Sequence, residues 1–276
     1  MSIQRSNDPA AFLAFERDAW NTVIGDYERL FASLTRQTAE PLFNAAKVTK
    51  GQRLLDVCSG HGGLAAEAAR RGADVVAIDF SAEAVAIARA RTAGVDFRQG
   101  DAQNLEFPGA SFDTVVCGYG IIHVPEPDRA LSEMFRVLKP SGRLAVSVWD
   151  KPSPDNGFGV VFEALKKHGR LDVPLPHGPD FFQFSDPEAM TGALGQIGLT
   201  DVTAIVVRQF WEMRQPADLI EAFLRGGVRL RALLREQEPS ALAAIKVTVA
   251  KGMERFRAGD GYRVPMPAIV GSGRKP

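Results

Sequence analysis

The sequence is poor in the features that mark secreted or membrane proteins. Its 276 residues include only two cysteines, Cys58 and Cys117, both within apolar runs. Two cysteines are too few for a disulfide scaffold and favour a reducing compartment. No apolar run reaches the roughly 20 residues that span a bilayer, and the first residues lack the apolar core of a signal peptide. We therefore expect a cytoplasmic protein without membrane insertion.

An excess of charge of one sign is also missing. The 33 basic and 33 acidic residues cancel, which gives no general attraction to nucleic acid or to an anionic membrane.

The four histidines include His61, His168 and His177, which lack the mutual spacing of metal ligands, so we predict no metal. Hydrophobic residues make up 45% of the chain, enough for one core in a single domain, residues 1–276. A homodimer is left open.

One stretch, residues 53–71, organises the chain. Residues 53–57 read as an apolar strand, three glycines follow at positions 60, 62 and 63, and residues 64–71 favour a helix. Such a turn presents bare backbone amides at the mouth of a sheet, where an anionic or polar ligand group can bind closely. The turn alone is a weak signal, because an ordinary tight turn between a strand and a helix has the same composition.

Strands and helices then alternate up to residue 149. Expected strands are 73–79, 95–102, 112–120 and 143–149, and expected helices are 82–92 and 126–138. This alternation predicts a mainly parallel sheet with helices on both faces. Cys58, Asp79, Asp101 and Gly118 fall at the carboxyl ends of four strands, so their turns should meet in one crevice. Asp79 lies about twenty residues after the glycine turn, the interval at which an acidic side chain reaches the two hydroxyls of a ribose. The alternative is that Asp79 caps the next helix, but Ser81 is the better candidate for that role.

The segments around this core are helical or irregular. We expect an N-terminal helical cap (1–48), a cofactor-binding core (49–150), a region with a loop, helices and strand six (151–215), a helical lid insertion (216–258), and the last strand with a tail (259–276). Strand six is expected over residues 199–213 and the last strand over 262–271. Pro265 and Pro267 should leave one end of the last strand unpaired.

Several motifs occur in order in the core. They are Leu54-Leu55-Asp56-Val57-Cys58-Ser59-Gly60-His61-Gly62, Val76-Ala77-Ile78-Asp79, Gly100-Asp101-Ala102, the run from Phe112 to Pro125, and Leu138-Lys139-Pro140-Ser141-Gly142. With these motifs, residues 51–149 resemble the class I S-adenosylmethionine-dependent methyltransferases, in the small-molecule branch that includes ubiquinone and menaquinone methyltransferases. The resemblance implies a Rossmann-like α/β fold with a seven-stranded, mostly parallel sheet and an antiparallel last strand. It also implies S-adenosylmethionine as cofactor and S-adenosylhomocysteine as product.

The resemblance implies a role for each motif. Cofactor contacts are expected from Asp56, Cys58, Gly60, Asp79, Phe80, Asp101, Ala102, Gly118 and Tyr119. Cys58 departs from the family, which usually has glycine or alanine there. His123 and Tyr119 are candidate catalytic residues; His123 at the mouth of strand four is either a general base or a positioning residue.

The acceptor is expected to be a mostly apolar or aromatic small molecule, methylated on O, N or C. This follows from the large apolar side chains in the first helices, in the loop after strand five and in the helical insertion. Trp20, Tyr27, Phe31 and Phe182 are candidate acceptor contacts. Simple packing over the sheet is the alternative for these aromatic residues.

Other functions stay open beside this one. The glycine turn with Asp79 also fits the fingerprint of an NAD(P)-dependent oxidoreductase. A catalytically inactive S-adenosylmethionine-binding protein would carry the same cofactor motifs. The arginines of residues 216–258 would suit a nucleic-acid methyltransferase, but no Asn-Pro-Pro-Tyr type motif follows strand four. We therefore expect a small-molecule acceptor and no nucleic-acid partner.

Overall fold

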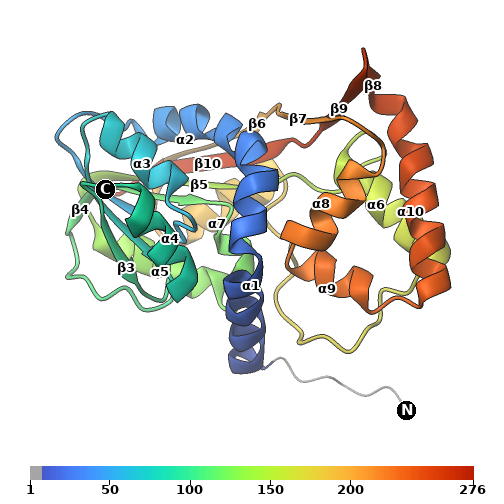
Figure 1. Ribbon diagram of the computed structural model, residues 1–276. Coiled ribbons are helices and arrows are strands. Elements are labelled where there is room, and N and C mark those ends of the chain that lie inside the picture. The colour runs from blue at the N-terminus through green and yellow to red at the C-terminus, as the bar shows by residue number, and fades with distance from the viewer. Residues whose placement is uncertain (1–7) are drawn as a thin grey trace.

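A seven-stranded sheet lies at the centre of the computed structural model (Figure 1), which describes residues 8–276. Its strands are ordered β3-β2-β1-β4-β5-β10-β6. They are β1 (Arg53–Val57), β2 (Asp74–Asp79), β3 (Asp96–Gln99), β4 (Phe112–Gly118), β5 (Leu138–Trp149), β6 (Thr200–Val207) and β10 (Ala268–Arg274). β1 to β5 pair in parallel and β10 runs antiparallel to β5 and β6. This confirms the predicted sheet. Residues 1–7 of the predicted cap 1–48 lie outside the described residues.

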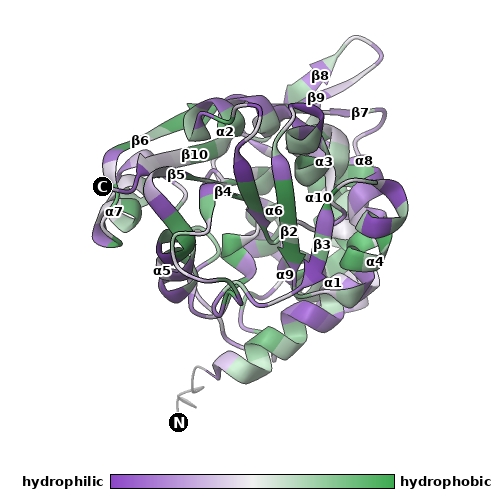
Figure 2. Cartoon of the chain, turned by 90° about the vertical axis from the view of Figure 1, so that its left-hand side faces the viewer, coloured by the Kyte–Doolittle hydropathy of each residue, from purple (hydrophilic) through white to green (hydrophobic). Residues whose placement is uncertain are grey.

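Helices cover both faces of this sheet because its central strands β1, β2 and β4 are largely apolar and buried on both sides. The edge strand β3 is mostly polar, as its colour in Figure 2 shows. One face packs against α2 (Ala39–Ala46), α3 (Gly63–Arg70) and α4 (Ala82–Arg91), and the other against α5 (Pro127–Val137) and α7 (Pro187–Gln196). Successive strand residues point to opposite faces, so Leu54 and Val75 join the first core while Leu55 and Val76 join the second. The core positions of β1 and β2 thus follow directly from the sequence pattern.

The remaining helices lie to one side of the sheet. The long helix α1 (Pro9–Thr35) begins at Asp8, whose side chain accepts hydrogen bonds from the N–H groups of Ala10 and Ala11 at 3.0 and 3.1 Å. In Figure 1, α1 stands between the sheet and a group of helices: α6 (Gly157–His168), α8 (Asp218–Gly226), α9 (Arg229–Arg235) and α10 (Pro239–Met253). Short 3₁₀ segments are η1 (Arg36–Thr38), η2 (Ile121–His123) and η3 (Glu254–Phe256). None of the helices in residues 8–276 has the length and apolar character of a membrane span.

A second, three-stranded sheet corrects the strand predictions near the C-terminus. It has the order β7-β9-β8, with β7 (Phe210–Met213), β8 (Arg257–Ala258) and β9 (Gly261–Pro265). The single strand predicted over 199–213 is therefore wrong, because β6 and β7 belong to different sheets. The single last strand over 262–271 is wrong for the same reason: Pro265 ends β9, which pairs with β7, and Pro267 precedes β10. The prolines mark a break between two paired strands and not an unpaired end.

Trp211 of β7 joins this second sheet to the helices. It is 4% exposed. Its ring centroid lies 4.4 Å from that of Phe31 on α1 and 5.8 Å from that of Phe223 on α8. Its Nε1–H donates to the carbonyl oxygen of Leu30 at 3.1 Å. One aromatic side chain thus connects three elements that are far apart in the sequence.

Trp211→Ala should lower the free energy of unfolding by about 3–5 kcal/mol, because it empties a packed site. Urea denaturation followed by circular dichroism measures this. Trp211→Phe keeps most of the ring contact and loses the hydrogen bond, so its loss should be nearer 1 kcal/mol. Equal losses in the two variants would show that the hydrogen bond, and not the packing, carries the contribution.

Candidate functional site

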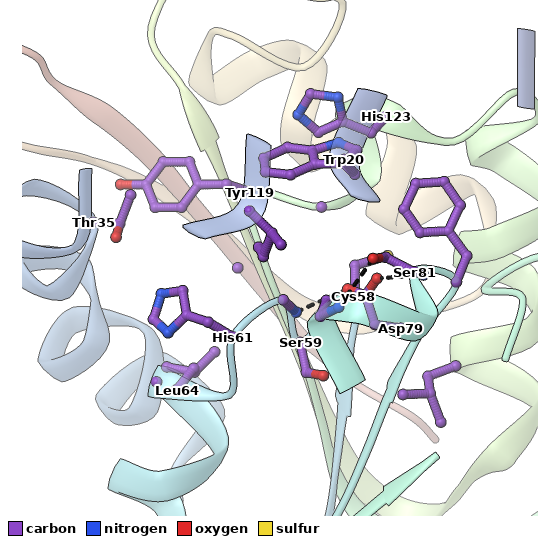
Figure 3. Close-up of a pocket in the computed structure, with 18 of the residues that line it drawn as sticks. Trp20, Thr35, Cys58, Ser59, His61, Leu64, Asp79, Ser81, Tyr119 and His123 are labelled. Carbon is purple, nitrogen blue, oxygen red and sulfur yellow. Dashed lines mark hydrogen bonds between the residues drawn. The ribbon is translucent and has the colours of Figure 1, made fainter. Parts of the chain in front are cut away.

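The carboxyl ends of β1, β2 and β4 open into one pocket that α1 covers (Figure 3). Of the predicted cofactor contacts, all except Asp56 line it: Cys58, Gly60, Asp79, Phe80, Asp101, Ala102, Gly118 and Tyr119. Separate turns of the sheet therefore converge, as ligand sites in parallel sheets do. Asp56 lies in β1 just beneath the glycine turn.

The glycine turn after β1 needs its glycines for two different reasons. Gly60 and Gly62 both have left-handed backbone angles, with φ of 54° and 83°. A Cβ at Gly62 would lie 2.8 Å from the Phe97 ring and 2.9 Å from Ala88 Cβ, so this glycine allows close packing beneath the turn. A Cβ at Gly60 would meet only Ile24 Cδ1 of α1, at 3.8 Å. Gly60 thus faces free space in the pocket.

Cys58 packs at a close approach of the turns after β1 and β4. Its φ is 59°, a conformation that favours glycine. A Cβ at Gly120 would lie 2.1 Å from Cys58 Cβ and 2.9 Å from its Sγ. Gly120 is therefore required for this contact, and sequence reasoning missed it. A hydrogen bond with Cys117, together with burial, raises the pKa of the Cys58 thiol well above its ordinary value, which disfavours the thiolate form that a nucleophile needs.

The carboxyl of Asp56 makes no hydrogen bond of normal geometry within residues 8–276, although the backbone N–H of Ala65 lies near enough to oppose the rise in its pKa. Asp56 is 1% exposed, and neither carboxyl oxygen accepts a hydrogen bond from the described residues. Burial, and then the neighbouring Asp79, raise the pKa of Asp56 well above its ordinary value. An unsatisfied buried acceptor costs about 1–3 kcal/mol. Such a cost beside a glycine turn suits a site that a ligand with donor groups completes.

Asp79 links the glycine turn to the start of α4. Its Oδ2 accepts from the N–H of Gly60 at 2.8 Å and its Oδ1 from the N–H of Ser81 at 2.9 Å. Burial raises the pKa of Asp79 to about 6, although these two donors oppose the shift. The Ser81 hydroxyl caps α4 by accepting from the N–H of Ala84 at 3.0 Å, as the sequence favoured, which leaves Asp79 at the pocket wall.

His123, in η2, also lines the pocket and has a partner that sequence reasoning missed. Its Nδ1 lies 2.8 Å from Oε2 of Glu16, and Oε1 of Glu16 accepts from Nε of Arg229 at 2.6 Å. Glu16 is fully buried, at 0% exposure. A signal was present: Glu16 lies four residues after Phe12 and four before Trp20, so an acid shares a helix face with two aromatic residues.

Tyr119 occupies the pocket wall as a neutral phenol. Its ring lies 4.2 Å from that of Trp149, and its hydroxyl oxygen accepts from Nε2 of Gln209 at 2.9 Å. Figure 3 shows the hydroxyl directed toward Thr35 and away from His123. Burial raises the pKa of Tyr119 above its ordinary value. The phenol therefore stays protonated, and His123 is the better proton acceptor of the two catalytic candidates.

The four candidate acceptor contacts divide into two pairs. Trp20 and Tyr27 of α1 line the pocket, whereas Phe31 and Phe182 do not. Phe31 packs against Trp211. The ring centroid of Phe182 lies 5.5 Å from that of Phe158. No residue of α8, α9 or α10 lines the pocket either. Of the three predicted acceptor walls, only the first helices take part in this pocket.

The end of the pocket near α3 is lined by three basic side chains and one acidic one. They are Arg36, His61, Arg70 and Glu67. Burial lowers the pKa of His61, so its ring is neutral and the guanidinium groups carry the charge. Arg70 pairs with Glu67, and Arg36 has no ion pair within residues 8–276. Across the same residues, no three histidine, cysteine or acidic side chains are grouped as metal ligands.

Comparisons with known proteins agree with this geometry. Residues 55–146 match the model of a methyltransferase domain family. Demethylmenaquinone methyltransferase of Renibacterium salmoninarum is 42% identical over 113 residues, which cover 41% of this chain and 48% of that protein. An uncharacterized protein of Mycobacterium tuberculosis is 31% identical over 140 residues, 49% of this chain and 50% of that protein. The chain thus spans about half the length of the curated relatives it matches.

Solved structures extend the likeness over most of the fold. The YcgJ protein of Bacillus subtilis has a TM-score of 0.59 at 21% identity and covers 87% of this chain and 98% of its own. Phosphoethanolamine N-methyltransferase 2 of Haemonchus contortus, in complex with S-adenosyl-L-methionine, has a TM-score of 0.56 at 21% identity, covering 95% of this chain and 60% of its own. The resemblance to class I S-adenosylmethionine-dependent methyltransferases is therefore confirmed, in sequence over residues 55–146 and in fold over most of the chain. Within that class, the matched segment resembles the demethylmenaquinone methyltransferases.

Asp56→Asn should stabilise the protein without ligand. The folded carboxyl holds its proton more strongly than the unfolded one, so the wild type loses stability as the pH rises above the ordinary aspartate range. The asparagine variant lacks this loss, and its advantage in melting temperature should be larger at about pH 8 than at about pH 5. Asp260→Asn, exposed between β8 and β9, is the control. An advantage that does not depend on pH would contradict the raised pKa.

Gly60→Ala should abolish ligand binding in the pocket and leave the protein folded, because the methyl group enters free space. The left-handed backbone adds a strain of about 1–2 kcal/mol. Gly51→Ala has the same kind of strain, with φ of 84° and nothing within 4 Å, outside the pocket. Calorimetric titration with S-adenosylhomocysteine should separate the two variants. Equal affinities in both would show that Gly60 does not touch the ligand.

Proposed function

We propose that this protein transfers a methyl group from S-adenosylmethionine to an O, N or C atom of a small, mostly apolar or aromatic molecule. The pocket above the glycine turn carries the proposal. It combines free space at Gly60, the unpartnered buried carboxyl of Asp56 and the carboxylate of Asp79. The matches of residues 55–146 to methyltransferases support it.

The residues present fit this cofactor. The carboxyl of Asp56 lacks donors, and the methionine part of the cofactor brings an ammonium group. Arg36 and Arg70 offer charge for the methionine carboxylate. Asp79 would hold the ribose hydroxyls. Phe80, Asp101 and Ala102 would surround the adenine, with Gly118 nearest the methyl group; all of them line the pocket.

The protein's own part in the reaction is alignment and exclusion of water. When bound, the cofactor supplies a methyl group made electrophilic by its sulfonium. Leu13, Trp20, Ile24 and Tyr27 of α1 close the pocket on the side facing the turns. Their apolar surfaces displace water from the reacting atoms.

The acceptor side of the pocket is aromatic. The rings of Trp20 and Tyr27 meet edge to face at 4.9 Å, and Tyr27 stacks on Phe31 at 4.9 Å. Burial raises the pKa of Tyr27, so its phenol is neutral. A wall of this kind favours an apolar or aromatic molecule over a charged one. Relatives named demethylmenaquinone methyltransferase support a small-molecule acceptor.

A binding protein without transferase activity is the second candidate. The [4+2]-cyclase SpnF shares this fold, with a TM-score of 0.51 at 24% identity, so the fold alone does not dictate methyl transfer. Incubation with methyl-labelled S-adenosylmethionine and a panel of small aromatic alcohols, amines and quinols distinguishes the two. A labelled product supports the transferase; cofactor binding without product supports the second candidate.

Asp79→Ala should weaken binding of S-adenosylhomocysteine by about 1–3 kcal/mol, because the ribose hydroxyls lose a buried acceptor. Titration calorimetry measures the change. Asp74→Ala, at the exposed opposite end of β2, removes the same side chain far from the pocket and should bind as the wild type does. Unchanged affinity in Asp79→Ala would exclude the ribose assignment.

A further inference from the structure

Glu16 and His123 form a hydrogen-bonded pair in which the carboxylate is held from both sides. Glu16 is fully buried in the middle of α1, and both of its carboxyl oxygens are used, one by His123 and one by Arg229. Arg229 also donates to the carbonyl oxygens of Pro179 at 2.8 Å and Ile122 at 2.7 Å. The carboxylate therefore has a fixed orientation toward the imidazole.

Glu16 has a second partner, Arg229, besides His123. Burial opposes ionisation of Glu16, but His123 and Arg229 outweigh it and lower the pKa of this carboxyl. The guanidinium of Arg229 stays charged at any working pH. It lies 4.5 Å from the centroid of the Phe12 ring and 5.5 Å from that of Phe181, so the ion pair is shielded from water. Arg229 thus gives Glu16 a cationic partner that does not depend on His123.

This arrangement fixes the tautomer of a neutral His123. An ionised carboxylate has no proton to donate, so the proton of the imidazole must lie on Nδ1, which faces Glu16. Nε2 then carries a lone pair. Within residues 8–276 no hydrogen bond reaches Nε2, although His123 lines the pocket.

Two aromatic side chains hold the imidazole at the pocket wall. The His123 ring centroid lies 5.0 Å from that of Trp20, with the planes at 90°, and 5.7 Å from that of Phe181. Figure 3 shows His123 and Trp20 together on the side of the pocket opposite the glycine turn. Because His123 lines the same pocket as Trp20 and Tyr27, an aromatic acceptor that lies against these two rings would lie near the imidazole.

We propose that Nε2 of His123 is the general base of the reaction, that Glu16 is the residue that positions it, and that the acceptor is a molecule whose receiving atom bears a removable proton. This rests on the proposed methyl transfer. Phenols, enols and acidic C–H groups belong to this class; tertiary amines and thioethers do not, because they have no proton to lose.

The step balances without a further reagent. The acceptor loses a proton to Nε2 and uses the released electron pair to bond the methyl carbon, whose bond to sulfur breaks with both electrons left on sulfur. His123 becomes an imidazolium next to the Glu16 carboxylate, which stabilises it. The side chain of His123 is 13% exposed, so it can return the proton to water.

The first test is the tautomer itself, which needs neither acceptor nor variant. Long-range ¹H–¹⁵N NMR of the wild-type protein with S-adenosylhomocysteine, assigned with His123→Gln, should show Nδ1 protonated and Nε2 unprotonated near neutral pH. A proton on Nε2, alone or with one on Nδ1, would overturn the proposal because Nε2 could then accept none.

Glu16→Gln provides the matching variant. Arg229 offers only donors, so the amide oxygen of the glutamine should turn to Arg229 and its NH₂ group to Nδ1. His123 must then carry its proton on Nε2, while both hydrogen bonds of the link persist. Asp18→Asn, exposed on the same helix, is the control and should keep the wild-type tautomer. An unchanged tautomer in a folded Glu16→Gln variant would exclude Glu16 as the positioning residue.

Turnover tests the acceptor class. With each acceptor that the labelling screen identifies, Glu16→Gln should lower kcat by about 100-fold or more and leave cofactor affinity unchanged. The assignment of His123 as general base would be contradicted by an unchanged kcat in Glu16→Gln. It would also be contradicted by acceptors that are methylated on an atom without a removable proton. A screen that yields no acceptor counts against the proposed transferase, whereas the NMR result tests the His123 tautomer separately.

Discussion

A buried carboxylate, that of Glu16, ties together parts of the chain that the sheet does not connect. It joins α1 to η2 through His123 and to α9 through Arg229. A buried charge is costly unless it is paired and hydrogen-bonded, and removing one partner leaves the other charge uncompensated. The positions of α1, η2 and α9 are therefore set together. Because α1 covers the pocket, the enclosure of the pocket depends on this interaction.

Acidic groups around the pocket differ because their partners differ. Glu16 has an arginine and a histidine, and its pKa is lowered despite complete burial. Asp79 has only backbone donors, and burial raises its pKa to about 6. Asp56 makes no hydrogen bond of normal geometry with the described residues, and burial, followed by the neighbouring Asp79, raises its pKa well above its ordinary value. Environments that separate the pKa values of neighbouring acids are typical of sites with divided roles. Here Glu16 is fixed between two side chains, whereas Asp56 and Asp79 have no side-chain partner within residues 8–276 and lie in or beside the pocket.

The sequence predicted the part of the pocket that the strand ends form because that part is local. Each strand end is followed at once by its turn, so Cys58, Asp79 and Gly118 could be placed from strand order alone. The other part depends on contacts that no spacing reveals: Glu16 lies 107 residues from His123 and 213 from Arg229. The break between β6 and β7 was missed for a similar reason, since an apolar run does not show that its strands join different sheets.

The aromatic wall of the pocket comes from outside the core. Residues 51–149 build the turns around Gly60 and Asp79, while α1 supplies Trp20 and Tyr27. The helices α8 to α10 line none of the pocket, yet Arg229 of α9 reaches Glu16 and, through it, the imidazole of His123. A change in α1 or α9 can therefore alter the aromatic wall of the pocket or the orientation of His123 without touching the turns of the core. The helical insertion reaches the pocket through Arg229, and it also packs against α1, where Arg225 pairs with Asp26 and Phe223 contacts Phe31.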